Sequence, residues 1–297
     1  MNGFLLIDKP AGISSNEALN ILKKKIMGKI GHTGTLDPFA TGLLVVAVGE
    51  TSKIIPYLNE EPKVYEAMLK LGEATDTLDK TGRITEKKTH LPIDREAVEK
   101  VLKSFVGRQT QMPPMYSAKK KEGKKLYELA RQGLEIKRQP QEIEIFELSL
   151  QIPPAPMEHS PLCQRGVGGD LISFRVSCSR GTYVRVLGAD LAGRLGTVGH
   201  LTELRRIQAG SFSVKDAVDP ASDFDLEKNL ISMESALAHL PSVDLSAVEA
   251  KRICQGQPIT AADTEKNIVV LKSGSDFLGI GEFRGGKLWP KRLVNSG

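Results

Sequence analysis

Residues 31–44 read Gly31-His32-Thr33-Gly34-Thr35-Leu36-Asp37-Pro38-Phe39-Ala40-Thr41-Gly42-Leu43-Leu44, and Val45-Val46-Ala47-Val48 follows them. One carboxylate, Asp37, thus stands in a loop shaped by glycine and proline, directly before an unbroken apolar run that predicts a buried strand. Pro38 favours extended geometry at Asp37 and removes the next backbone donor. A stiff loop anchored in the core is a suitable mount for a catalytic group. An ordinary Asp-Pro turn is the alternative interpretation of the same residues.

The size and composition predict one large domain or two domains of unequal size. The chain has 297 residues, of which 40% are hydrophobic. Asp8 and Lys9 lie within the first ten residues, which argues against a signal peptide, and no apolar stretch approaches the ~20 residues of a membrane span. Three distant cysteines without a Cys-x-x-Cys pair argue against a disulfide framework and a zinc site. We therefore expect a cytoplasmic protein that does not bind membranes.

The charge is distributed unevenly along the chain, although the formal net charge is only +5. Residues 108–138 contain nine basic and three acidic residues, whereas residues 211–245 contain seven acidic and two basic ones. The first segment is suited to polyanions, and the second is expected to be a solvated connector. A lysine cluster can also be no more than a soluble face.

The hydrophobic pattern predicts alternating strands and helices in the first part of the chain. Residues 63–71 alternate, with Tyr65 on the apolar face, as in a half-buried strand. A helix capped by Ser14 or Ser15 is expected, and a second helix should run from an Asp94 cap to Gly107. Further predicted strands cover residues 3–8, 43–48, 142–152 (with a bulge between Ile145 and Phe146) and 171–178, and a third helix covers residues 183–195.

Two later regions are expected to lie outside this core pattern. Residues 108–140 carry the basic excess with little apolar periodicity, so we interpret them as a long insertion over the surface. Residues 153–170 are rich in proline and glycine and predict a loop. The last block, residues 241–297, has short strands at 268–271 and 277–283 punctuated by glycines, which predicts a small barrel.

Several blocks occur in an order that matches a known family. The residues 31–44 are followed by Gly49-Glu50-Thr51-Ser52-Lys53, and the other blocks are Leu5-Leu6-Ile7-Asp8-Lys9-Pro10, Tyr65-Glu66-Ala67, Gly72-Glu73-Ala74-Thr75-Asp76-Thr77, Met115-Tyr116-Ser117-Ala118-Lys119 and Ser179-Arg180-Gly181-Thr182-Tyr183-Val184-Arg185. Over most of its length the chain resembles the TruB-type tRNA pseudouridine synthases.

The resemblance implies a fold and a domain division. The expected fold is α/β (α+β), the pseudouridine synthase fold with a mixed, largely antiparallel central sheet, followed by a small PUA-like β-barrel. Residues 1–240 would form the catalytic domain, with an RNA-binding insertion at about 108–140. Residues 241–297 would form the PUA-like RNA-binding domain.

The implied reaction is the isomerisation of uridine 55 in the T loop of tRNA to pseudouridine. The base leaves the sugar at N1, turns and rejoins through C5, so no metal or cofactor is required. Residues 28–35 lack the Gly-Lys-Ser/Thr ending of a P-loop, and residues 166–169 lack the Rossmann spacing. The resemblance marks Asp37 as the essential carboxylate, acting as nucleophile or base.

The remaining active-site residues are implied by the resemblance. Arg185 would pair with Asp37 through two hydrogen bonds, although an arginine on a helix is by default a surface residue. Tyr65 would be the platform for the flipped base, and periodicity alone makes it a core residue. Tyr183, His32 and Leu204 complete the expected substrate site; Tyr183 could equally be packing at a helix start, and His32 a structural hydrogen-bonding residue.

The RNA is expected to be held by lysine, arginine and tyrosine side chains that contact phosphates without reading sequence. These are Lys9, Tyr116, Lys119, Lys124, Arg205 and Arg206. The expected partner is the T stem-loop of tRNA, with no obligate protein partner. Two alternatives remain at this point, a non-catalytic RNA-binding or RNA-folding protein on the same scaffold and a guide-dependent rRNA-modifying relative. A hydrolase that uses carboxylates is less consistent with the sequence, because such an enzyme would need a second acid at the site and the sequence indicates none.

Overall fold

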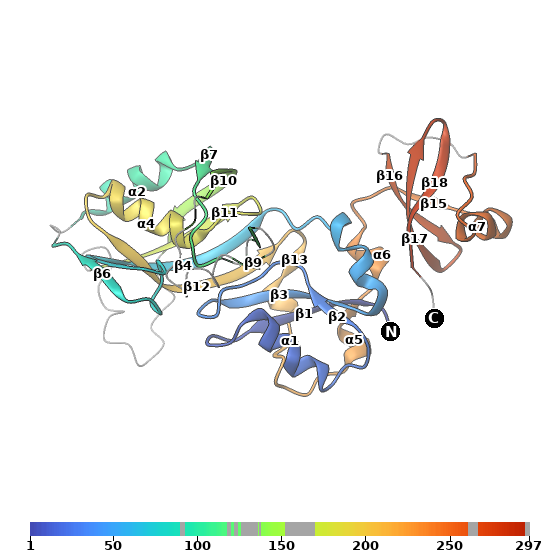
Figure 1. Ribbon diagram of the computed structural model, residues 1–297, viewed down its shortest axis with the longest axis horizontal. Coiled ribbons are helices and arrows are strands. Elements are labelled where there is room, and N and C mark those ends of the chain that lie inside the picture. Colours follow the sequence, from blue (N-terminus) through green and yellow to red (C-terminus); the bar gives the residue numbers. More distant parts are fainter. Residues whose placement is uncertain are drawn as a thin grey trace.

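The computed structural model describes residues 1–89, 93–117, 120–121, 124–125, 136, 138–151, 170–260 and 267–294. These residues form a large body and, beyond residue 240, a smaller one at the other end of an elongated molecule (Figure 1). The elements are β1 (Gly3–Lys9), α1 (Ser15–Lys23), β2 (Ile30–His32), β3 (Thr41–Val48), η1 (Gly49–Lys53), η2 (Ile55–Tyr57), β4 (Lys63–Leu71), β5 (Glu73–Thr75), β6 (Ile84–Lys87), α2 (Arg95–Ser104), β7 (Gly107–Gln111), β8 (Lys120–Lys121), β9 (Lys124–Lys125), β10 (Gln141–Leu150), β11 (Leu171–Cys178), α4 (Val184–Arg194), β12 (Gly199–Ala209), β13 (Phe212–Ser213), η3 (Val214–Asp216), α5 (Leu226–Asn229), β14 (Leu230–Ile231), α6 (Met233–Ala236), β15 (Ser242–Asp244), α7 (Ala247–Cys254), β16 (Ile268–Ser273), β17 (Asp276–Arg284) and β18 (Lys287–Leu293).

A single mixed sheet organises the large body. Its strand order is β14-β1-β3-β12-β4-β11-β10-β7, with β2 added to β3 and β13 added to β12. The described pairings are antiparallel except that between β12 and β3, where Arg205 and Arg206 lie opposite Thr41 and Gly42. The predicted mixed, largely antiparallel sheet is therefore confirmed. The parallel pairing brings the end of the residue 31–44 stretch to the middle of the sheet.

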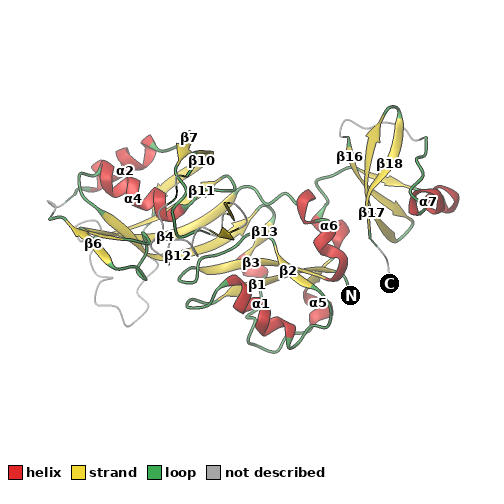
Figure 2. Ribbon diagram, in the orientation of Figure 1, coloured by secondary structure: helices red, strands yellow, loops and turns green. Residues whose placement is uncertain are grey.

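Helices α2 and α4 cover one face of this sheet (Figure 2). The side chains of Tyr65, Ala67, Leu69 and Leu71 alternate along β4 into the same core as α4, as the sequence pattern predicts. Helices α1 and α2 begin at the polar caps that the sequence predicts. Ser14 and Glu17 form a capping box for α1, and the Asp94 side chain accepts from Ala97 N for α2.

The predicted bulge in the tenth strand is present, but the neighbouring insertion was expected too early. The register of β10 against β11 shifts between Ile145 and Glu147, which leaves Phe146 as the extra residue. Strand β7 pairs with β10, from Gln111 opposite Gln141 to Gly107 opposite Ile145. Residues 107–111 therefore belong to the sheet, because their backbone continues its ladder.

The acidic segment 211–245 is more than a solvated connector. Its seven acidic side chains are exposed, as expected. However, β14 pairs with β1 at the sheet edge, and Met233, Ala236 and Leu237 are buried in a core with Phe4 and Leu6. Its apolar residues therefore complete the large body.

The C-terminal part contains its own four-stranded sheet in the order β15-β16-β17-β18, together with α7. Its small core includes Leu245, Ile253 and Leu288. The two parts share a second apolar cluster, in which Val270, Ile280 and Val294 join Ile54 and Leu237 of the large body. Within the described ranges, no helix is both long and apolar enough to cross a membrane.

Candidate active site

The Asp37 loop connects β2 to β3 and is anchored by its neighbours. Leu36, Phe39 and Ala40 are buried in the core that also contains Tyr65. The Asp37 side chain itself is 33% exposed, so the loop presents its carboxylate to solvent from a fixed base. Gly42, at φ +100°, follows the loop as the second residue of β3, and a Cβ atom there would clash with the carbonyl oxygen of Arg206. Only glycine allows this close approach of two backbones.

Arg185 lies in the first turn of α4 and binds the Asp37 carboxylate with two parallel hydrogen bonds. Its Nε donates to Oδ2 at 2.7 Å, and its Nη2 donates to Oδ1 at 3.1 Å. The contact predicted between these two residues is therefore present. A paired fork of this kind fixes the orientation of the carboxylate as well as opposing its negative charge.

The other donors of Arg185 bind two further segments of the chain. Nη1 donates to the carbonyl of Thr77 at 2.6 Å, and Nη2 donates to the carbonyl of Tyr116 at 2.7 Å. The side chain is only 3% exposed. Because each arm of the guanidinium is bound, Arg185 joins the Asp37 loop, the turn after β5 and the root of the insertion at one point.

Asp79 is a second carboxylate at this point, which the sequence analysis missed. It is buried, and its Oδ2 lies 3.7 Å from Nη1 of Arg185. Its Oδ1 accepts from the hydroxyls of Thr77 and Thr81 and from the Thr81 backbone N–H. An aspartate flanked by threonines two residues away on each side is a local signal for such a turn. Nothing in that pattern, however, indicates that Arg185 lies against it.

The two aromatic candidates border the Asp37 loop from different elements. Tyr65 lies on β4 opposite Arg206 of β12, and burial raises the pKa of its phenol. Tyr183 is the N-cap residue of α4, and burial likewise raises the pKa of its phenol. Both hydroxyls are therefore protonated at neutral pH. Leu204, which lies opposite Ala67 on the neighbouring strand, adds apolar surface to the same core.

His32 lies at the end of β2, five residues before Asp37. Its Nδ1 is buried and has no hydrogen-bond partner among the residues that the structure describes. Burial, and then the positive charge of Arg206, lower the pKa of the imidazole. The ring is therefore neutral at pH 7.

Comparisons with known proteins show the family of this chain. The family described as "TruB family pseudouridylate synthase (N terminal domain)" matches residues 20–184, and the one described as "Pseudouridine synthase II TruB, C-terminal" matches residues 241–294. This chain belongs to the TruB family. It is accordingly a pseudouridine synthase, an isomerase.

Relatives of this TruB-family enzyme match over nearly the whole chain. The tRNA pseudouridine synthase B of Geobacter sulfurreducens is 43% identical over 89% of this chain and 85% of its own length. The protein of the same name from Dechloromonas aromatica is 40% identical over 99% of this chain and 96% of its own. The Cbf5 fold in a crystal structure of a Cbf5-Nop10-Gar1 complex matches with a TM-score of 0.69 at 21% identity, over 98% of this chain and 84% of that one. At that identity the match shows a common fold.

Two of the residues expected to bind RNA are buried in the TruB-family enzyme, which corrects their prediction. Arg206 is 2% exposed, and its guanidinium donates to the carbonyls of Leu43 and Gly34. Lys9 is fully buried, and its Nζ donates to the carbonyls of Pro10, Ile13 and Pro38. Burial lowers the pKa of Lys9 to about 8, against the opposing effect of the Asp37 charge. Both side chains satisfy backbone carbonyls around the Asp37 loop and do not face phosphates.

The other RNA-binding candidates have different surroundings. Arg205 is partly exposed and bound to Asp8 by two hydrogen bonds, at 2.9 and 2.6 Å. Tyr116 is partly exposed at the root of the insertion. Lys119 lies outside the described residues, and for Lys124 only the backbone is described, where β9 pairs with β8. Their contacts with RNA therefore stay predictions.

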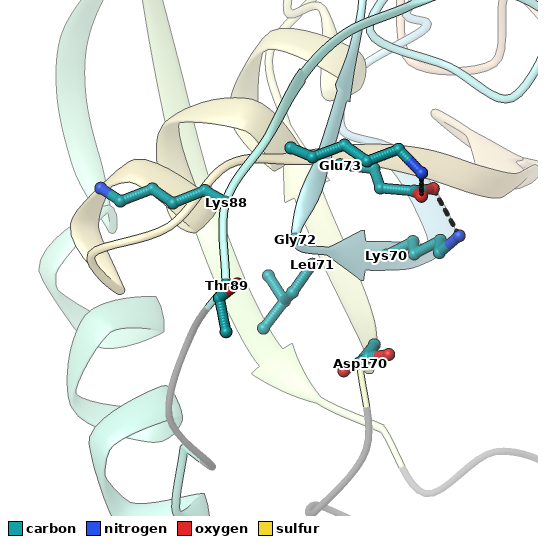
Figure 3. A pocket seen from close by; sticks show the side chains of 8 residues that line it. Lys70, Leu71, Gly72, Glu73, Lys88, Thr89 and Asp170 are labelled. Atoms are coloured by element: carbon teal, nitrogen blue, oxygen red, sulfur yellow. Dashed lines mark hydrogen bonds and ion pairs between the residues drawn. The ribbon is translucent and has the colours of Figure 1, made fainter.

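A separate pocket of about 360 Å³ lies at the far end of β4, lined by Lys70, Leu71, Gly72, Glu73, Lys87, Lys88, Thr89 and Asp170 (Figure 3). Lys70 and Lys87 both bind Glu73, which lowers the pKa of that carboxyl to about 2. None of the residues around Asp37 lines it. Across the described residues, no group of three or more His, Cys, Asp or Glu side chains is arranged to hold a metal ion.

Proposed function

We propose that this TruB-family enzyme converts uridine 55 in the T loop of tRNA to pseudouridine, with Asp37 as the carboxylate that acts on the target nucleotide. The observation that carries the proposal is the Asp37–Arg185 pair, in which a partly exposed carboxylate is oriented by a buried arginine. The tRNA substrate is supported by the names of relatives that match across nearly the full chain.

The reaction conserves the atoms of the base apart from one exchange of hydrogen. The bond between C1′ and N1 breaks, the uracil turns, and a bond between C1′ and C5 forms. The hydrogen on C5 is released, and N1 acquires a proton. Asp37 can serve this sequence either by adding to C1′ or by removing a proton from the sugar, and both roles need an ionised carboxylate held next to the ribose.

The target uridine must leave the folded T loop before this carboxylate can reach its sugar. Tyr65, Tyr183 and Leu204 would receive the extruded base, because they supply aromatic and apolar surface next to the Asp37 loop. The protonated hydroxyl of Tyr65 could then help to transfer the proton at C5. His32, neutral and incompletely bonded, would adjust as the RNA enters.

The remaining RNA contacts would come from the exposed basic surface. We retain Arg205, Tyr116, Lys119 and Lys124 for phosphate contacts, with residues 241–297 as a PUA-like RNA-binding domain beside a catalytic domain of residues 1–240. Because such contacts release counterions, binding should weaken steeply as salt increases. The enzyme would work on tRNA in the cytoplasm without a protein partner.

The substrate is tested with the purified chain alone and an unmodified tRNA transcript labelled with tritium at C5 of its uridines. We expect the release of one tritium per tRNA, and no release when uridine 55 is replaced by cytidine. The same should hold for an isolated T stem-loop. Release from another position, or a requirement for added proteins or guide RNA, would contradict the proposal.

A further inference from the structure

A buried hydroxyl from α1 holds the Asp37 loop at the residue directly before the carboxylate. Ser15 is 1% exposed, and its Oγ accepts from the backbone N–H of Leu36 at 2.9 Å and donates to the carbonyl of Leu36 at 3.1 Å. Leu36 directly precedes Asp37 in the chain. One hydroxyl therefore satisfies both main-chain groups of the residue next to the carboxylate.

The Arg185 side of the pair has a matching arrangement on a different element. Gln111, on β7, is 4% exposed. Its Oε1 accepts from the backbone N–H of Tyr183 at 2.8 Å, and its Nε2 donates to the carbonyl of Tyr183 at 3.1 Å. Tyr183 caps α4, and Arg185 follows two residues later. One amide therefore fixes the start of the helix that carries the arginine.

These two contacts have a common geometry that an ordinary structural hydrogen bond lacks. Each buried side chain binds the N–H and the C=O of one residue, which fixes both the position and the rotation of that peptide segment. Each comes from an element other than the one it holds, namely the first turn of α1 for the loop and the edge strand β7 for α4. The Asp37–Arg185 bonds span the two segments that are held in this way.

We propose that Ser15 and Gln111 are positioning residues, which hold the Asp37 loop and the start of α4 so that the carboxylate and guanidinium meet in the productive orientation. This rests on the proposed function, because it gives Asp37 its role. The hydrogen bonds of the two side chains go to the backbones of Leu36 and Tyr183, so each side chain acts on Asp37 or Arg185 through the main chain.

The expected effect of losing either contact is on the chemical step. A displacement of the reacting carboxylate by about 1 Å lowers the rate by up to about 100-fold. We therefore expect Ser15→Ala and Gln111→Met each to lower kcat by about 10- to 100-fold, with KM for the T stem-loop within about twofold of the wild type. RNA affinity should be retained, because both side chains are buried away from solvent.

The chain offers a matched control for each variant. Ser14→Ala removes the cap of the same helix, where Ser14 Oγ accepts from Glu17 N. Gln109→Met removes an amide on the same face of the same strand, which donates to the carbonyl of Phe105 on the α2 side. Both controls lose a hydrogen bond of similar kind without touching Leu36 or Tyr183. Their kcat should stay within about twofold of the wild type.

The experiment uses the full chain and the tritium-release assay, under single-turnover and steady-state conditions, at a temperature where circular dichroism shows every variant folded. A second measurement places Gln111→Met in an Arg185→Lys background, where the two-bond fork is already lost. If Gln111 acts by positioning Arg185, Gln111→Met should lower the kcat of the Arg185→Lys variant by less than about threefold. The geometry that Gln111 maintains is already lost in that variant.

Three results would overturn the proposal. They are an unchanged kcat in Ser15→Ala and Gln111→Met, an equal fall in kcat in the Ser14→Ala and Gln109→Met controls, and the same fall from Gln111→Met with and without Arg185. If Ser15→Ala does not fold, Gln111→Met still tests the proposal, because the two residues lie on different elements. Asp37→Asn, assayed in parallel, tests the proposed function separately, since that function can hold even when both positioning variants retain full activity.

Discussion

Two aspartate–arginine pairs in this molecule have the same chemistry and different surroundings. Arg185 binds Asp37 with hydrogen bonds of 2.7 and 3.1 Å, and Arg205 binds Asp8 with hydrogen bonds of 2.9 and 2.6 Å. The carboxylates are equally accessible, at 33% and 34% exposed. The arginines differ, because Arg185 is 3% exposed and Arg205 is 39% exposed.

The difference lies in what else holds each arginine. Arg185 also donates to the carbonyls of Thr77 and Tyr116, and its carboxylate partner sits in a loop clamped from several sides. Arg205 adds a contact of 3.5 Å to the hydroxyl of Thr41. An ion pair alone therefore does not indicate a functional site. The feature that distinguishes the Asp37 pair is a buried, fully bound arginine that presents one partly exposed carboxylate.

The largest difference between the pairs should be in stability when each arginine is replaced by lysine. Arg185→Lys removes the two-bond fork to Asp37 and donors to the carbonyls of Thr77 and Tyr116 at a buried position, so we expect a loss of about 3–5 kcal/mol in the free energy of unfolding. Arg205→Lys changes an exposed pair and should cost less than about 1 kcal/mol. Urea unfolding of the two variants measures both values. Equal losses would mean that the two pairs have the same structural role.

Lys9 links the two pairs, because it follows Asp8 on β1 but points into the core below Asp37. Burial lowers its pKa from 10.5 to about 8. Between these two pH values the unfolded chain binds a proton that the folded protein has lost, so this group makes the folded state more stable as pH rises. The free energy of unfolding of the wild type should therefore increase relative to Lys9→Met, by about 3 kcal/mol between pH 7 and pH 10.5.

This dependence on pH is measured by urea unfolding of both proteins at several pH values in that window. Lys53→Met, at an exposed lysine, is the control for the replacement of a lysine by methionine. A constant difference between wild type and Lys9→Met across the window would mean that the amine of Lys9 is not desolvated.

Asp79→Asn should have a smaller effect on the Arg185 pair. The side-chain amide of the variant has N–H donors that can face the donors of Thr77 and Thr81, where the carboxylate only accepts. We therefore expect a loss of about 1–3 kcal/mol in the free energy of unfolding and a lower kcat. Asp76→Asn in the same turn is the control, because Asp76 pairs with the exposed Arg83. Thermal unfolding and tritium release check both. Asp79→Asn behaving like Asp76→Asn would remove Asp79 from the network around Arg185.

Much of the fold could be predicted from the sequence because its signals are local. The caps at Ser14 and Asp94, the alternation along residues 63–71 and the phase change at Phe146 each act within a few residues. Residues 108–111 were wrongly given to the insertion, since their sequence, Arg-Gln-Thr-Gln, lacks apolar alternation. They form a strand because β10 offers an unpaired edge, which is a tertiary effect.

The sequence predicts the part of the candidate site that lies in recognisable motifs. It does not predict which charged side chains are buried. The contact between Asp37 and Arg185 was expected, although 148 residues separate them. Lys9 and Arg206 were expected to face RNA, because lysine and arginine are rarely buried. Here each is held inside by backbone carbonyls, which no sequence pattern reveals. Asp79 was missed for the same reason, as its partner comes from a distant helix.

A comparison of Asp37→Asn with Asp8→Asn in single-turnover tritium release from the T stem-loop tests whether Asp37 is the reacting carboxylate. Each variant neutralises one carboxylate of a two-bond arginine pair and keeps its shape. We expect Asp37→Asn to lower the rate by more than about a thousandfold while RNA binding persists, and Asp8→Asn to stay within about threefold of the wild type. Near-normal turnover by Asp37→Asn, or equal losses in both variants, would contradict this role of Asp37.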